Sequence, residues 1–154
     1  MTTNEQLVIS EKFKSVVNYY PRNKLRYIHY KTVQNFIFHL DNFSDNFQKD
    51  KIAKSLIEYI DLIDQSAIVG NATEARELFQ TYLEPIVNVY EKQLNFHLTI
   101  KPTTVLFFAI PLFLFSYMLK ASIVYYFGLL ALIIPLIARH FYYESKRLVY
   151  SIMY

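Results

Sequence analysis

The chain has 154 residues, which is enough for one domain with an appendage. It is 53% hydrophobic and 19% charged, whereas ordinary soluble domains carry about a quarter charged residues. It contains no cysteine, which excludes disulfide bonds and thiolate chemistry. The first residues are polar and lack the basic and apolar regions of a cleaved signal peptide, so we expect no such signal.

The first hundred residues contain four stretches in which apolar residues recur at three- and four-residue steps, as on one face of an α-helix. This periodicity predicts helices over about 4–20, 22–40, 52–70 and 71–94. Pro21 and Gly70 end the first and third of these, and Pro85 predicts a kink or a break in the fourth. No stretch alternates as a strand does, so we expect no sheet. The fold class is therefore all-α, with a small cytosolic bundle of about four helices over residues 1–100.

Positive charge gathers near the start of this region. Residues 11–31 hold six bases and one acid, whereas residues 41–91 hold ten acids and four bases. One interpretation is that the two parts neutralise each other across the bundle. Another is that the bases contact anionic lipid, at roughly 1 kcal/mol each. The candidate lipid contacts are Lys12, Lys14, Arg22, Lys24, Arg26 and Lys31. Tyrosines interleave with them, but aromatic residues at helical spacing usually belong to a core, so nucleic acid is disfavoured as a partner.

A long apolar segment runs from Thr103 to Ala138, and Lys120 is its one charged residue. A single helix over these 36 residues would be about 54 Å long, far more than a hydrocarbon core of about 30 Å. Two shorter helices on either side of Lys120 fit that thickness. We therefore predict a transmembrane helical hairpin over 101–139, with a turn at the far interface. The alternative is a shallow wedge that does not cross the bilayer. The turn residues are Lys120, Ala121 and Ser122.

Four residues shape the expected hairpin. Pro111 and Pro135 are expected to kink the two helices. Ser116 and Gly128 are small enough to allow close contact between helices. The turn lacks the residues that usually permit a tight reversal, so we expect the helix ends around it to fray.

Positive charge also predicts the orientation. Lys101 precedes the hairpin and Arg139, Lys146 and Arg147 follow it, against one lysine in the turn. The positive-inside rule therefore predicts an integral membrane protein, in a bacterial inner membrane or its equivalent, with both termini cytosolic.

The last residues mix these bases with aromatic rings. Tyr142 and Tyr143 follow the second apolar helix, and Tyr150 and Tyr154 come further on. Bases and tyrosines are typical of the headgroup level of a membrane. Residues 140–154 are therefore expected to form a short interfacial amphipathic helix.

No motif indicates a reaction. The four histidines, at 29, 39, 97 and 140, do not have the spacing of a metal-binding pair, and no Glu-x-x-His sequence occurs. Only two glycines are present, so there is no glycine-rich phosphate loop. We expect no enzyme activity, no metal and no cofactor.

Three functions are compatible with these features. The leading hypothesis is a non-catalytic membrane-anchored interaction or scaffold protein that acts through its cytosolic bundle, as a homo-oligomer or as a subunit of a larger membrane complex. The alternative is an oligomeric effector of a toxin or defence system that forms pores or depolarises the membrane. The third is a hairpin that shapes the membrane.

Overall fold

The computed structural model describes residues 4–65, 71–98, 102–120 and 123–151, and most of them are helical, which confirms the all-α class. The chain divides into two compact units. Met1–Leu98 and Leu148–Tyr154 form the first, called here the bundle unit, and Thr99–Arg147 form the second, called the helical pair. The elements of the bundle unit are α1 (Asn4–Tyr19), η1 (Arg22–Lys24), α2 (Tyr30–His39), η2 (Leu40–Asn42), α3 (Asn46–Gln65), α4 (Ala72–Leu78), η3 (Phe79–Leu83), α5 (Glu84–Leu94), β1 (His97–Leu98) and β2 (Val149–Tyr150). Those of the helical pair are α6 (Pro102–Met118) and α7 (Ile123–Ser145).

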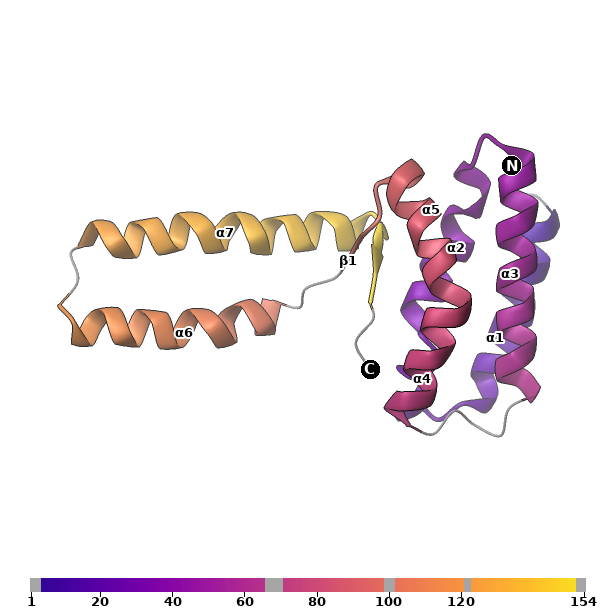
Figure 1. Ribbon diagram of the computed structural model, residues 1–154, viewed down its shortest axis with the longest axis horizontal. Coiled ribbons are helices and arrows are strands. Elements are labelled where there is room, and N and C mark those ends of the chain that lie inside the picture. The colour runs from indigo at the N-terminus through magenta and orange to yellow at the C-terminus, as the bar shows by residue number, and fades with distance from the viewer. Residues whose placement is uncertain (1–3, 66–70, 99–101, 121–122, 152–154) are drawn as a thin grey trace. The chain divides into compact units, whose positions relative to one another are not determined.

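The bundle unit is a helical bundle, as the sequence predicts. α1, α2, α3 and the continuous run from α4 to α5 lie alongside one another (Figure 1). α1 contacts both α2 and α3, and α3 contacts η3. The apolar stripes of these helices meet in one core. Its largest fully buried side chains are Tyr59, Tyr90, Phe36 and Phe96.

The second helix is shorter than predicted. Periodicity indicates a start near residue 22, but α2 begins at Tyr30. The preceding residue, His29, has φ 49° and ψ 37°, a left-handed conformation that a right-handed helix cannot include. Residues 22–29 therefore form η1 and turns, although their apolar side chains still reach the core, as Ile28 does.

The fourth helix begins where its sequence indicates, and it changes to π-helical hydrogen bonding just before Pro85. The Oδ1 atom of Asn71 accepts a hydrogen bond from the backbone N–H of Glu74 at 2.9 Å, which satisfies one unpaired donor of the first turn. Pro85 has no backbone N–H to donate, and the π-helical η3 lies directly before the segment that contains it. Phe79 and Leu83, both within η3, are buried in the core.

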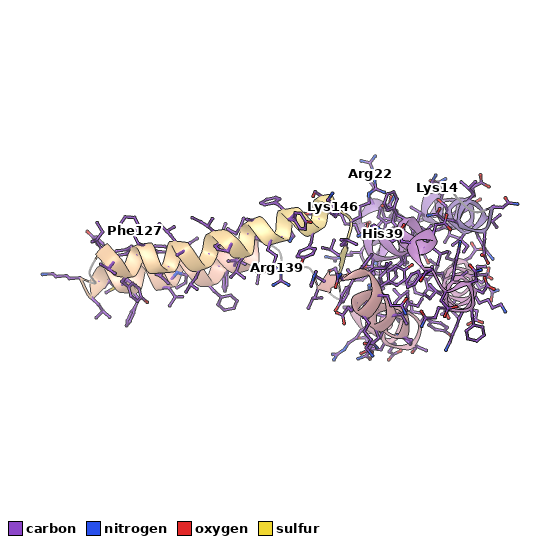
Figure 2. All side chains as sticks on the ribbon, turned by 90° about the horizontal axis from the view of Figure 1, so that it is seen from above. Lys14, Arg22, His39, Phe127, Arg139 and Lys146 are labelled. Atoms are coloured by element: carbon purple, nitrogen blue, oxygen red, sulfur yellow. The ribbon has the colours of Figure 1, made fainter. Side chains whose placement is uncertain are left out.

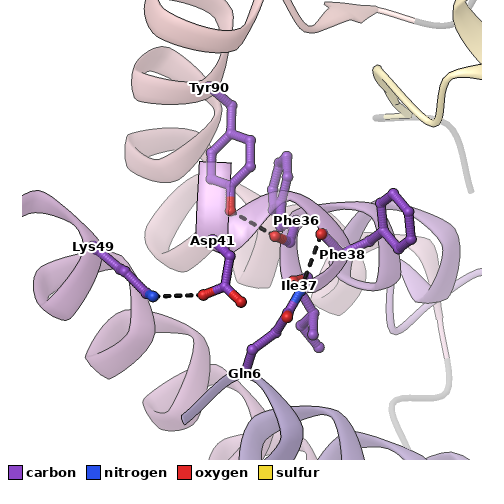
Figure 3. A network of polar contacts seen from close by, with 7 residues as sticks. All are labelled: Gln6, Phe36, Ile37, Phe38, Asp41, Lys49 and Tyr90. Atoms are coloured by element: carbon purple, nitrogen blue, oxygen red, sulfur yellow. Dashed lines mark hydrogen bonds and ion pairs between the residues drawn. The ribbon is translucent and has the colours of Figure 1, made fainter. Parts of the chain in front are cut away.

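Side chains from other helices satisfy the last carbonyl groups of α2 (Figure 3). The Nε2 atom of Gln6 donates to the carbonyl oxygens of Ile37 at 2.7 Å and Phe38 at 3.0 Å. The hydroxyl group of Tyr90 donates to the carbonyl oxygen of Phe36 at 2.6 Å. Because the last four carbonyls of a helix have no partner within it, these bonds fix α1 and α5 to the end of α2.

The end of the chain differs from the prediction. Residues 140–145 continue α7 and Val149–Tyr150 form β2, so the separate helix predicted over 140–154 is not present in the described residues 140–151. β2 pairs in parallel with β1, with His97 opposite Val149 and Leu98 opposite Tyr150. The prediction of no sheet is therefore wrong, because β1 and β2 form a sheet of two strands with two residues each. Tyr150, expected at the headgroup level, is 7% exposed and belongs to the core of the bundle unit. Tyr154 lies outside the described residues.

The helical pair consists of two antiparallel helices that lie side by side (Figure 1). α7 has 23 residues and is the one described helix long and apolar enough to cross a membrane. α6 is equally apolar in character but has 17 residues.

Candidate functional site

The outer surface of the helical pair exposes many large apolar side chains to solvent. Large apolar side chains are exposed along both helices, among them Phe107 at 72%, Phe127 at 66% and Met118 at 80%. Figure 2 shows the side chains pointing outward along α7, with Phe127 nearer its first turns and Arg139 nearer its end. Soluble monomers rarely expose a continuous apolar surface of this extent, which marks it as a surface for lipid or protein.

Small residues let the two helices approach each other. Ala109 and Ser116 are the buried residues of α6, and they lie seven positions apart, on one face of the helix. The Ser116 hydroxyl group donates to the carbonyl oxygen of Leu112 at 2.6 Å, so it adds no unpaired polar group to the contact. Phe113 and Tyr126 stack across the pair with ring centroids 6.0 Å apart. The close helix contact expected at Ser116 stays a prediction.

Gly128 does not make the close contact expected of it within the chain. A Cβ atom built there would meet no described atom within 4 Å. Gly128 is exposed on α7, whereas Tyr126, Leu129 and Ile133 on the same helix are partly buried. Pro111 and Pro135 both lie inside continuous helices, and the expected kinks stay predictions.

Directly after α6, the turn between the helices contains a residue in the left-handed backbone conformation. Lys120 has φ 48°, and its N–H donates to the carbonyl oxygen of Tyr117 at 3.1 Å. Lys120 thus occupies the place that glycine usually takes at a helix C-terminus. Ala121 and Ser122, the other predicted turn residues, lie outside the described part of the chain.

Charged and aromatic side chains meet near the end of α7. The Arg139 guanidinium lies 5.5 Å from the centre of the Tyr143 ring. His140 and Glu144, one helical turn apart, approach to 3.1 Å between Nε2 and Oε2. Tyr142 is exposed. Lys146 and Arg147, the other predicted anchors, follow α7 directly, whereas the predicted anchor Lys101 lies outside the described residues.

The bundle unit holds both ends of the helical pair. β1 comes three residues before α6, and β2 comes soon after α7. Besides the ladder, the N–H of His97 donates to the carbonyl oxygen of Leu148 at 3.0 Å. The chain therefore leaves the bundle unit and returns to it at neighbouring strands.

Residues 148–151, called here the tail segment, are bound by side chains that sequence reasoning did not single out. The Nδ2 atom of Asn35 donates to the carbonyl oxygen of Val149 at 2.8 Å. The N–H of Ser151 donates to Oγ1 of Thr32 at 3.0 Å. These α2 residues, together with Phe79, Glu91 and His97, form the tail site. A tail segment of four residues is too short for periodicity to have indicated this contact.

Tyr150 is the central side chain of the tail segment. Its hydroxyl group donates to Oε1 of Glu91 at 2.5 Å, and its ring stacks on Phe79 at 6.5 Å between centroids. Burial raises the pKa of Tyr150 above its usual value, and the negative charges of Glu91 and Glu84 raise it further. Tyr150 therefore stays a neutral hydrogen-bond donor.

His29 lies beside the tail site. Its Nε2 atom is 2.8 Å from the carbonyl oxygen of Ala75, and its ring is 5.1 Å from that of Phe79. Burial lowers the pKa of His29, while hydrogen bonds to the backbone of Ala75 and Ser151 partly oppose the change. The net effect favours a neutral imidazole at this position.

The six predicted lipid-contacting bases are spread over several elements. Lys12 on α1 forms an ion pair with Asp61 on α3 at 2.5 Å, as expected if charge is neutralised across the bundle. Lys24 and Arg26 both lie over the ring of Tyr27, at 5.2 and 4.7 Å from its centre. The remaining three are exposed: Lys14, Arg22 and Lys31.

The described residues include no group of three or more His, Asp or Glu side chains that could hold a metal ion. The candidate site is an apolar surface joined to a folded unit. Comparison of the chain with protein-family models, with curated proteins and with solved structures gave no match.

Proposed function

We propose that this protein is a non-catalytic, membrane-anchored interaction protein. The helical pair inserts in a bilayer as a hairpin, and the bundle unit remains on the cytosolic side, where it binds a partner or another copy. The observation that carries the proposal is the pairing of β1 with β2, which joins the two ends of an exposed apolar helical pair within one folded unit.

This pairing limits how the helical pair can enter a membrane. A segment with both ends fixed in one folded, water-exposed unit must enter and leave the bilayer on the same side. It therefore crosses an even number of times. Two helices joined by a short turn meet this requirement, whereas a single crossing by α7 alone does not.

The lengths of the two helices support insertion. α7, with 23 residues, is about 35 Å long, enough for a core of about 30 Å. α6, with 17 residues, is about 25 Å long, and local thinning of the bilayer accommodates such a mismatch. Each central Leu, Ile, Phe or Val favours insertion by about 0.3–0.6 kcal/mol. Lys120, in the turn, reaches the far interface rather than the core.

The bundle unit supplies the binding function in this proposal. Its interior is filled by aromatic and aliphatic side chains, and its candidate chemistry is hydrogen bonding and packing. A small domain that gains stability from a partner or a neighbouring copy fits a role in a membrane complex.

The topology can be tested with single cysteines, because the natural chain has none. Lys120→Cys places a thiol in the turn, and Ser44→Cys places a matched exposed thiol in the bundle unit. Intact cells are treated with a membrane-impermeant maleimide, before or after permeabilisation. We expect Cys at 120 to react from outside and Cys at 44 to react only after permeabilisation, with the protein retained in membranes after alkaline extraction.

Other results would contradict the proposal in distinct ways. Protein released by alkaline extraction would show that the helical pair is not inserted. Retained protein in which neither thiol reacts from outside would indicate the shallow wedge. Expression is expected to leave the membrane potential intact, and its collapse would indicate the permeabilising effector instead.

A further inference from the structure

The tail site holds the tail segment as a protein holds an extended peptide. Side chains of α2 bind its backbone on both sides of Tyr150, through Asn35 at 2.8 Å from the carbonyl oxygen of Val149 and Thr32 at 3.0 Å from the N–H of Ser151. β1 adds main-chain pairing, the mode in which strand addition gives affinity. Such contacts recognise an extended chain regardless of which molecule supplies it.

One side chain gives the site its selectivity. Tyr150 is 7% exposed, stacks on Phe79 and donates to Glu91. A segment without a tyrosine at this position would leave the ring site unfilled and the carboxylate without this donor. The chemistry therefore fits an extended segment with a tyrosine between two residues that are bound through their backbone, as Tyr150 lies between Val149 and Ser151.

We propose that the tail site exchanges tail segments between neighbouring copies, so that the bundle unit of one copy binds residues 148–151 of a second copy. All contacts of the closed form are recovered in the exchanged form, so exchange needs no new interface. A connection of two residues, Lys146 and Arg147, joins α7 to the tail segment. Arg147 has φ 56°, and opening this connection relieves its strain.

The membrane favours this exchange, and this step rests on the proposed function. Hairpins in one bilayer lie side by side, which gives neighbouring tail segments a high effective concentration. The exchanged copies form the oligomer through which an interaction protein of this kind would act.

The test uses the register of the ladder. His97 and Val149 are direct partners in the ladder, so cysteines at the two positions are adjacent and a disulfide bond between them reports docking. One copy carries His97→Cys and one affinity tag, and a second copy carries Val149→Cys and a different tag. They are coexpressed, membranes are oxidised, and disulfide-linked pairs carrying both tags are quantified. The control replaces His97→Cys with Glu58→Cys, an exposed position on α3.

If copies exchange tail segments, linked pairs exceed the control about tenfold or more, because docking holds the thiols together. The variant with both cysteines in one chain reports the closed form as a link within the chain. Links found only within that chain, or links between chains at the control level, overturn the proposal. So does a double variant that forms no link, since the tail segment is then not docked.

A second measurement needs no change at the site. The unmodified protein, purified in detergent, should elute as a dimer or larger form by light scattering corrected for bound detergent, and Tyr150→Ala should shift it toward the monomer. An oligomer unchanged by Tyr150→Ala argues against exchange. Alkaline extraction of the same membranes keeps the outcomes separate: retained protein without linked pairs contradicts the exchange alone, and released protein contradicts the proposed anchoring.

Discussion

Four described residues other than glycine have positive φ, and each lies at the edge of a helix. His29 precedes α2, Asn95 follows α5, Lys120 follows α6 and Arg147 follows α7. The chain has only two glycines, so other residues must supply these conformations. Asparagine tolerates the left-handed region well, whereas a long side chain there costs about 1 kcal/mol. The strain lies where the chain changes direction.

Arg147→Gly is expected to stabilise the docked tail segment. Glycine removes the Cβ clash of the left-handed conformation, and we expect the free energy of unfolding of the bundle unit to rise by about 0.5–1 kcal/mol. Urea unfolding in detergent, followed by tyrosine fluorescence, measures the change. Arg147→Ala is the matched control, because it removes the charge but keeps Cβ. An equal gain in both variants would assign the effect to charge and contradict the role of strain.

His29 makes the stability of the bundle unit depend on pH. Its pKa is lowered from 6.5 by burial. Below that value the unfolded chain binds a proton more readily than the folded one, so the free energy of unfolding falls as the pH drops. Above it the imidazole is neutral in both states and the effect disappears. Urea unfolding between about pH 7.5 and pH 5.5 measures this loss.

The matched variant for that measurement is His29→Asn, which keeps a side chain suited to the left-handed conformation and cannot titrate. We expect it to lower stability at neutral pH, because the contact with the Ala75 carbonyl is lost. Its stability should depend less on pH than that of the natural protein. Equal dependence in the two proteins would show that His29 does not titrate as described.

At the scale of elements, the sequence predicts the helices whose apolar residues recur with helical periodicity. The stripes of α1 and α3 and the Asn71 cap of α4 follow local rules and agree with the structure. α3 nevertheless begins at Asn46, earlier than predicted, and its predicted end at Gly70 lies outside the described residues. The start of α2 could not be predicted, because one left-handed histidine overrides a continuous apolar pattern. Nor could β2, because its partner β1 is about fifty residues away and each strand has only two residues.

Tyr150 should be essential to the stability of the bundle unit rather than to membrane contact. Tyr150→Ala leaves a cavity beside Phe79 and is expected to lower the free energy of unfolding by about 3–5 kcal/mol. Tyr150→Phe keeps the ring and removes only the hydrogen bond to Glu91, at a cost of about 1 kcal/mol. Urea unfolding distinguishes the two. A Tyr150→Ala protein as stable as the natural one would show that the tail segment is not part of the core.

At the scale of the molecule, composition locates the apolar region from the sequence, but only the fold connects its two ends. Lys120 and the short stretches around it predict a reversal. The joining of both ends in one unit depends on Asn35, Thr32 and Glu91, residues that look like ordinary polar positions of helices. Their role follows from long-range contacts that no local pattern contains.

Removal of the helical pair should therefore leave a folded, soluble bundle unit. Residues 99–147 are replaced by a Gly/Ser linker of about eight residues. This length allows the chain to run from the end of β1 back to the start of β2, which lies at the other end of the two-residue parallel ladder. We expect the protein to be soluble without detergent, with a helical circular dichroism spectrum and cooperative unfolding, because the exposed apolar surface is gone and the tail segment still binds.

The matched control ends at Leu98 and lacks the tail segment, so it should be less stable by an amount similar to the effect of Tyr150→Ala. Equal stability of the linked and truncated proteins would mean that the tail segment adds nothing to the bundle. Aggregation of the linked protein would mean that the bundle unit needs the helical pair to fold, and both units would then have to be treated as one.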